Sequence, residues 1–169
     1  MAFRVALTWN VHDIAMRAVP AIETASGLPE SFRRLVRLEA KHLVLRDRAY
    51  ADLWNERATR AASELDRLGT LLVSPDEIMW HHRTVAAFAA YRGHVEQARA
   101  HLARGEVERA QQISERPARE AAEQAETSVI KLTAASNGAL GRAQADAATL
   151  AARTWTAVVA AFLGGLVVA

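Results

Sequence analysis

The fold is decided by residues 74–105, which read SPDEIMWHHRTVAAFAAYRGHVEQARAHLARG. Ser74, Pro75 and Glu77 supply a serine N-cap, a proline in the first helical turn and a carboxylate that can close a capping box. Gly105 follows as a stop, because glycine adopts without strain the left-handed conformation that ends many helices. Between these signals a stripe of residues recurs at spacings of three and four, which is typical of a helix packed at a shallow angle on its neighbours. The stripe consists of His81, Thr84, Phe88, Tyr91, Val95, Ala98 and Leu102.

The same spacing recurs in the rest of the chain. Its stripes are Leu35, Leu38, His42, Leu45 and Ala49; Trp54, Ala58, Ala61, Leu65, Leu68 and Leu72; and Ala125, Val129, Leu132, Ser136, Ala139, Ala143, Asp146 and Leu150. We predict helices at 3–46, 48–72, 75–104 and 106–154. The first of them is expected to kink near 20–29, where Pro20 and Pro29 interrupt it. Because short connections make sequential helices antiparallel, the predicted fold is all-α, an antiparallel up-down-up-down four-helix bundle.

Composition favours one helical domain over residues 1–154. The chain of 169 residues is 51% hydrophobic and 24% charged, a balance that supports a folded core. Cysteine is absent, which excludes disulfides, thiolate metal sites and thiol catalysis. The formal net charge of +2 gives no electrostatic attraction to nucleic acid. Because no nucleophile elbow, phosphate loop or paired-carboxylate motif is present, we expect this fragment to be non-catalytic and to bind no cofactor.

The segment 155–169, WTAVVAAFLGGLVVA, differs from everything before it. No charged residue follows Arg153, and the apolar residues lie on every side of the helix. A membrane span needs about 20 residues, so we interpret this segment as the start of a transmembrane helix, truncated in this sequence, that continues the last helix of the bundle. Arg153 and Trp155 are then expected at the membrane interface. The alternative is a buried C-terminal helix, which would normally carry a single apolar stripe.

Four features together resemble the four-helix-bundle sensor domain of bacterial transmembrane receptors, namely sensor histidine kinases and methyl-accepting chemotaxis proteins. The features are Val19-Pro20-Ala21-Ile22 after an apolar start, the Leu45-Arg46-Asp47 turn followed by Tyr50, the Leu102-Ala103-Arg104-Gly105-Glu106 turn, and the Ala-rich last helix through Asn137 into Arg153-Thr154-Trp155. The resemblance covers nearly the whole chain and depends on pattern more than on any one motif. No ligand-binding motif of the family is matched.

The resemblance implies an input module of a two-component or chemotaxis receptor. Such a domain stands on the periplasmic side of the bacterial inner membrane, forms a homodimer, senses a small-molecule or protein ligand and displaces helices across the membrane. We favour a sensor histidine kinase, with a chemoreceptor as the close alternative. A different class of function also fits the pattern: a non-receptor helical interaction or scaffold protein with a C-terminal membrane anchor.

Two groups of polar residues are candidate sites. Arg33, Arg34, Arg37 and Lys41 form a basic face on the first helix, where an anionic ligand is expected if one binds there. The alternative is a solvated face paired with Glu30 and Glu39. Four histidines invite a metal hypothesis, but they lack the spacing of a ligand set, so we expect no metal site; they are His81, His82, His94 and His101. His42, on the core stripe, is expected to be a hydrogen-bonded core residue.

Overall fold

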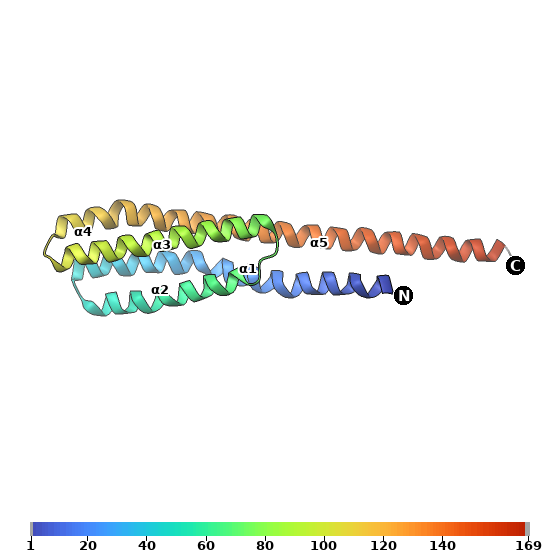
Figure 1. Cartoon of the computed structure of the whole chain (residues 1–169), viewed down its shortest axis with the longest axis horizontal. Helices are drawn as coiled ribbons and strands as arrows, with labels where there is room; N and C mark the ends of the chain where they lie inside the picture. The colour runs from blue at the N-terminus through green and yellow to red at the C-terminus, as the bar shows by residue number, and fades with distance from the viewer. Residues whose placement is uncertain (1, 168–169) are drawn as a thin grey trace.

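The computed structural model describes the backbone of residues 2–167 and the side chains of residues 16–149 and 152, and this part of the chain is entirely helical apart from its turns (Figure 1). Its elements are α1 (Ala2–Leu45), α2 (Arg48–Gly69), α3 (Pro75–Ala103), α4 (Val107–Ile113), the π-helical turn η1 (Ser114–Ala118) and α5 (Arg119–Val167). α1 is a single helix that contains both Pro20 and Pro29. The prediction of an all-α, bundle-like fold is therefore confirmed.

The turns between helices are short and follow the sequence signals. Ser74 accepts a hydrogen bond from the Glu77 amide, and the Glu77 carboxylate accepts one from the Ser74 amide, so the predicted capping box is present. Asp47 caps α2 through its side chain, which accepts from the Ala49 amide. Gly105 has a φ of 79°, the left-handed conformation that glycine adopts without a Cβ clash. Each end is thus fixed by local chemistry before any packing is considered.

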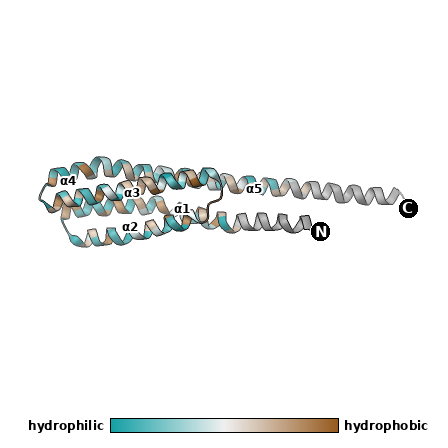
Figure 2. Ribbon diagram, in the orientation of Figure 1, coloured by the Kyte–Doolittle hydropathy of each residue, from teal (hydrophilic) through white to brown (hydrophobic). Residues whose placement is uncertain are grey.

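The helices lie side by side, and α1 and α5 extend past the α2–α3 turn at the end where both termini lie (Figure 1). The α1–α2 and α3–α4 turns are together at the opposite end, which we call the distal end. α1 packs mainly on α2 and α5, and α3 packs mainly on α5, whereas α2 and α3 approach each other less closely. Hydrophilic and hydrophobic residues alternate around each helix of the bundle (Figure 2).

The core is filled by the central residues of the predicted stripes of α2, α3 and α5 together with residues of α1, whereas Asp146, near the end of the last predicted stripe, is exposed. Phe32 and Phe88 stack with their ring centroids 5.1 Å apart, and Trp54 and Tyr91 lie at 6.0 Å. The remaining large buried side chains are Leu28, Leu35, Leu65, Leu68, Val95, Val129 and Leu132. These aromatic rings come from α1, α2 and α3 and pack these three helices together.

The predicted stripe of α1 was wrong in its second half. Leu45 is 59% exposed, and Leu38 and His42 are only half-buried. The buried positions are instead Phe32, Leu35, Glu39 and Leu43, at spacings of three, four and four. That sequence of spacings follows the 3.6-residue period of a straight helix, which drifts away from a strict heptad. The drift brings a carboxylate, Glu39, into the core.

The membrane segment is predicted at 155–169, with Arg153 and Trp155 at the membrane interface. The side chains of all these residues lie outside the described residues. The backbone of α5 is helical to Val167. Within the part of the chain that the structure describes, no helix combines the length and hydropathy of a membrane span.

Candidate functional site

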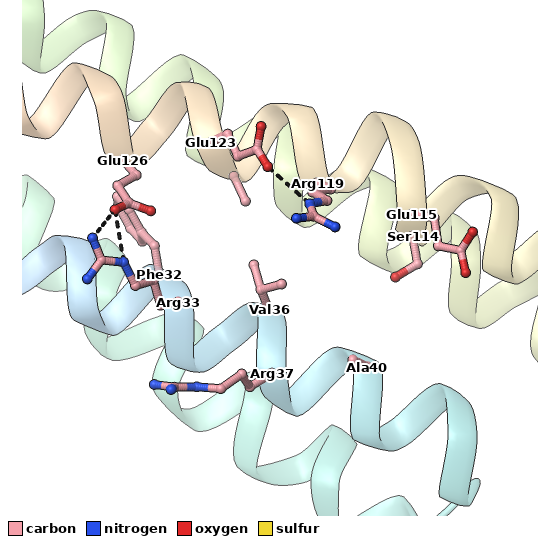
Figure 3. A pocket seen from close by; sticks show the side chains of 11 residues that line it. Phe32, Arg33, Val36, Arg37, Ala40, Ser114, Glu115, Arg119, Glu123 and Glu126 are labelled. Atoms are coloured by element: carbon pink, nitrogen blue, oxygen red, sulfur yellow. Dashed lines mark hydrogen bonds and ion pairs between the residues drawn. The ribbon is translucent and has the colours of Figure 1, made fainter.

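A hollow that we call the α1–α5 hollow lies between two long helices and could hold a small ligand. It has a volume of about 410 Å³ and opens between α1 on one side and η1 and α5 on the other (Figure 3). Phe32, Val36, Ala40 and Ala122 form its apolar lining. Its polar lining consists of Arg33, Arg37, Ser114, Glu115, Arg119, Glu123 and Glu126. An apolar floor with a charged rim is the usual composition of a ligand pocket.

One wall of the hollow exists because of a proline. Pro117 has no amide hydrogen, so it cannot supply the i to i−4 hydrogen bond that an α-helix needs at this point. The chain instead forms the π-helical turn Ser114–Ala118, and then resumes as α5. Ser114 and Glu115 lie on this turn and line the hollow (Figure 3). Single π-turns of this kind are frequent at functional sites.

The charges around the hollow balance, because three arginines face three glutamates. Arg33 donates from Nε to Glu126 Oε1 at 2.9 Å and also from Nη2, which links α1 to α5 (Figure 3). Arg119 donates to Glu123 at 3.0 Å along α5. The hydrogen bond to Glu126 raises the pKa of Arg33. Glu115 has no hydrogen-bond or ion-pair partner among the described residues.

The four cations predicted to bind an anion are not gathered into one site. Arg33 and Arg37 line the hollow, whereas Arg34 lines a smaller one on the α2 side. Arg34 and Arg37 donate to Glu30 at 3.0 Å and 2.7 Å, and these hydrogen bonds lower the pKa of Glu30. Lys41 lies 5.6 Å from the centre of the Tyr50 ring. Three of the four cations are thus paired with carboxylates, with Arg34 and Arg37 sharing Glu30.

A buried polar cluster lies near the distal end, and sequence reasoning missed it. Glu39 of α1 is 2% exposed and accepts from Arg99 of α3, at 2.7 Å from Nη2 and 3.1 Å from Nε. Arg99 also donates to Asn55 Oδ1 at 2.9 Å, and its guanidinium lies 4.4 Å from the centre of the Trp54 ring. The Trp54 indole donates to the Tyr91 hydroxyl at 3.1 Å. Three helices are joined by this cluster.

The cluster holds Glu39 in an unfavourable environment. Burial raises the pKa of the Glu39 carboxyl, although the charge and hydrogen bonds of Arg99 and the nearby His42 oppose the change. One oxygen, Oε1, is buried without a hydrogen-bond partner. Burial also raises the pKa of Tyr91. The sequence signal that identifies Glu39 is its spacing of four from Leu35 and from Leu43, which places it on the buried face.

Two of the histidines, His81 and His42, hydrogen-bond to backbone carbonyls. His81 donates from Nε2 to the Leu65 carbonyl at 2.8 Å, near the end of α2. Its ring is so close to α2 that a Cβ on Gly69 would meet His81 Cε1 at 2.8 Å. His42 donates from Nδ1 to the Asp47 carbonyl at 3.0 Å, so it is hydrogen-bonded at the α1–α2 turn. No three metal-binding side chains gather among the residues whose side chains are described.

Comparison with known proteins adds nothing to this geometry. No protein-family model, no curated protein and no solved structure matches the chain.

Proposed function

We propose that the chain is the sensing input domain of a membrane-bound bacterial signal-transduction receptor, specifically a sensor histidine kinase. The observation that supports this proposal is the position of the α1–α5 hollow. α1 and α5 are the two helices that extend together past the α2–α3 turn (Figure 1). A molecule in the hollow contacts both, so its binding energy can favour one relative position of α1 and α5 over another. A chemoreceptor input domain would work in the same way.

The lining of the hollow favours a small zwitterion over an anion. The arginines and glutamates are balanced in number, and Arg33 and Arg119 are already paired with carboxylates. Glu115 is unpartnered and suits an ammonium group. Arg37 on the opposite wall donates to Glu30 through Nη2, and the other N–H groups of its guanidinium suit a ligand carboxylate. This replaces the anionic ligand that the basic face of α1 predicts.

The coupling between hollow and helices can be tested without knowing the ligand. The chain has no cysteine, so spin labels can be attached at Ala18→Cys and Ala139→Cys, which come from α1 and α5 and line one small hollow near the α2–α3 turn. Ala40→Trp fills the α1–α5 hollow from its exposed side. We expect it to shift the distance between the labels, whereas the control Ala100→Trp on the exposed surface of α3 should leave the distance unchanged. An unshifted distance in Ala40→Trp would refute the coupling.

The proposal also places the distal turns in the periplasm and the last helix in the membrane from Trp155 onward, with the bundle forming a homodimer. Alkaline phosphatase and a fluorescent protein can be inserted in turn at Gly105, on the exposed α3–α4 turn. We expect active phosphatase and no fluorescence, with the chain in the membrane fraction. Fluorescence from the insertion would reject the receptor and favour the scaffold protein with a membrane anchor.

The predicted anchor is tested separately. A chain ending at Arg153 that remains in the membrane fraction would reject the predicted anchor.

A further inference from the structure

A second groove lies between α3 and α5 and differs from the α1–α5 hollow in how its charges are arranged. Its volume is about 690 Å³. Ala86, Ala87 and Ala90 of α3 form its smooth apolar floor, and the half-buried Trp80 lies at one end. The other lining residues are Arg83, Glu120, Glu123, Gln124, Thr127, Ser128 and Lys131.

Two cations from different helices converge on the Trp80 ring. The Arg83 guanidinium of α3 lies 4.7 Å from the ring centre, and the Lys131 ammonium of α5 lies 4.6 Å from it. Neither cation has a carboxylate partner among the residues whose side chains are described. Arg33, Arg34 and Arg37 on α1 are all paired with carboxylates, whereas Arg83 and Lys131 instead share contact with one aromatic ring.

The carboxylates of the groove, Glu120 and Glu123, form no ion pair with either cation, and on α5 they lie well away from Lys131. Glu123 precedes Lys131 by two turns, and at 1.5 Å per residue the two positions are roughly 12 Å apart along the helix. Glu123 is also held by Arg119 at 3.0 Å, and Glu120 is further away still. The groove therefore has a positive end at Trp80 and an acidic end at Glu120.

The hydroxyl groups beside Lys131 are free to bind a ligand. Thr127 and Ser128 lie one helical turn before Lys131 and line the groove. The hydroxyls of Thr59, Thr84 and Thr133 donate to the carbonyl one turn earlier in their own helices. Thr127 and Ser128 make no such bond within the described part of the chain, so their hydrogens are available to an acceptor in the groove.

We propose that this groove binds a small organic dicarboxylate. Its carboxylates accept hydrogen bonds from Arg83, Lys131 and the two hydroxyls, and its aliphatic carbons lie on the alanine floor. Each of the two cations can pair with one carboxylate, and the apolar floor favours a carbon chain over a compact phosphate. The proposed site does not depend on the membrane topology or on a ligand in the α1–α5 hollow. An experiment that rejects the proposed function therefore does not reject this site.

Glutarate is the probe that tests the site on the full chain in detergent micelles. Isothermal titration calorimetry should give saturable binding in the millimolar range or tighter. In the ¹H–¹⁵N spectrum, the Trp80 indole signal, assigned from its loss in Trp80→Phe, should move with the same saturation curve. Arg83→Gln and Lys131→Gln should each weaken binding at least about 10-fold, because each removes a charge-assisted contact.

Matched controls separate this site from general charge attraction. Arg48→Gln makes the same charge change at a side chain that is 91% exposed and far along the chain from the groove, and it should leave the affinity for glutarate unchanged. The neutral analogue 1,5-pentanediol should not bind. The proposal is overturned if glutarate produces no saturable signal at about 10 mM, if Arg48→Gln weakens binding as much as Lys131→Gln, or if inorganic phosphate binds as tightly as glutarate.

Discussion

Two sets of arginine–glutamate pairs involve neighbouring turns of α1. They have the same chemistry but differ in their exposure to solvent. The side chains of Arg33, Arg34 and Arg37 are 56%, 57% and 63% exposed, and their pairs lie in solvent. Glu39 is 2% exposed and its partner Arg99 is 17% exposed. Water and salt screen the first set, so these pairs contribute little to stability. In the core the same contact is unscreened, and each partner depends on the other.

The comparison shows that the buried pair is the more vulnerable of the two. Both Glu39 and Arg99 lose hydration on folding, and their attraction offsets that loss only while both are present. The unpartnered Oε1 of Glu39 leaves the offset incomplete. The cluster joins α1, α2 and α3 through Glu39, Asn55 and Arg99, so a change there alters the packing of three helices.

The largest effect is expected from Arg99→Met, which leaves Glu39 buried and unpaired. We expect a loss of about 3–5 kcal/mol in the free energy of unfolding, measured by urea denaturation followed by circular dichroism. The double variant Glu39→Leu/Arg99→Met removes both charges and should regain most of that loss. If the double variant is no more stable than Arg99→Met, the buried charge is not the cause of the destabilisation.

The destabilisation caused by Arg99→Met should depend on pH. The pKa of Glu39 is raised in the folded protein, so the folded state binds this proton more tightly than the unfolded chain does. The stability from Glu39 is therefore fully present below its ordinary pKa and is lost as the pH rises through the raised value. Arg99→Met removes the group that opposes the rise. Its destabilisation should be small at about pH 4 and large at about pH 8, and Glu39→Gln should abolish the difference.

A smaller effect is expected at the contact between α2 and α3. Gly69→Ala places a Cβ against the His81 ring, which is itself hydrogen-bonded to α2. We expect a net loss of about 1 kcal/mol in thermal or urea unfolding, because overpacking exceeds the helical gain of alanine. Gly93→Ala, where no atom lies within 4 Å, should instead stabilise by about 0.5–1 kcal/mol. In a His81→Ala background, Gly69→Ala should also stabilise; a loss there would contradict the steric explanation.

The capping box at the start of α3 should affect the free energy of unfolding about as much as the Gly69–His81 contact does. Ser74→Ala removes the hydroxyl that accepts from the Glu77 amide, and we expect a loss of about 1 kcal/mol in urea unfolding. Burial alone would raise the pKa of Glu77, but hydrogen bonds with Ser74 and from the Val73 amide hold it below its ordinary value. The stability from Glu77 is thus present at neutral pH and is lost as the pH falls through the lowered value. Ser63→Ala, within α2, is the control and should change stability little.

The sequence predicted the helices and their caps well, because those features depend on local chemistry. Ser74 and Glu77 form the expected box, and the stripe through Phe88, Tyr91 and Val95 is buried. The polar contacts between helices were not predictable, because they depend on how the helices rotate against one another. A rotation of less than one residue's spacing decides whether Glu39 or Leu38 faces the core. For the same reason the basic face of α1 could be located, but its partners could not.

The smallest effect is expected at the Arg33–Glu126 pair, which crosses the α1–α5 hollow. Arg33→Gln, Glu126→Gln and the double variant form a cycle whose coupling should be small, because Arg33 is 56% exposed and Glu126 is 23% exposed, so water reaches the pair. Any residual coupling should disappear in about 1 M salt. The same cycle on Glu39 and Arg99 should retain its coupling in salt, because those charges are buried. If the exposed pair proved as strongly coupled as the buried one, exposure would not be what separates the two sets. The shape of the hollow would then depend on the Arg33–Glu126 pair, and a ligand would have to break that pair to bind. Strengthening the pair should therefore weaken the binding of a zwitterion.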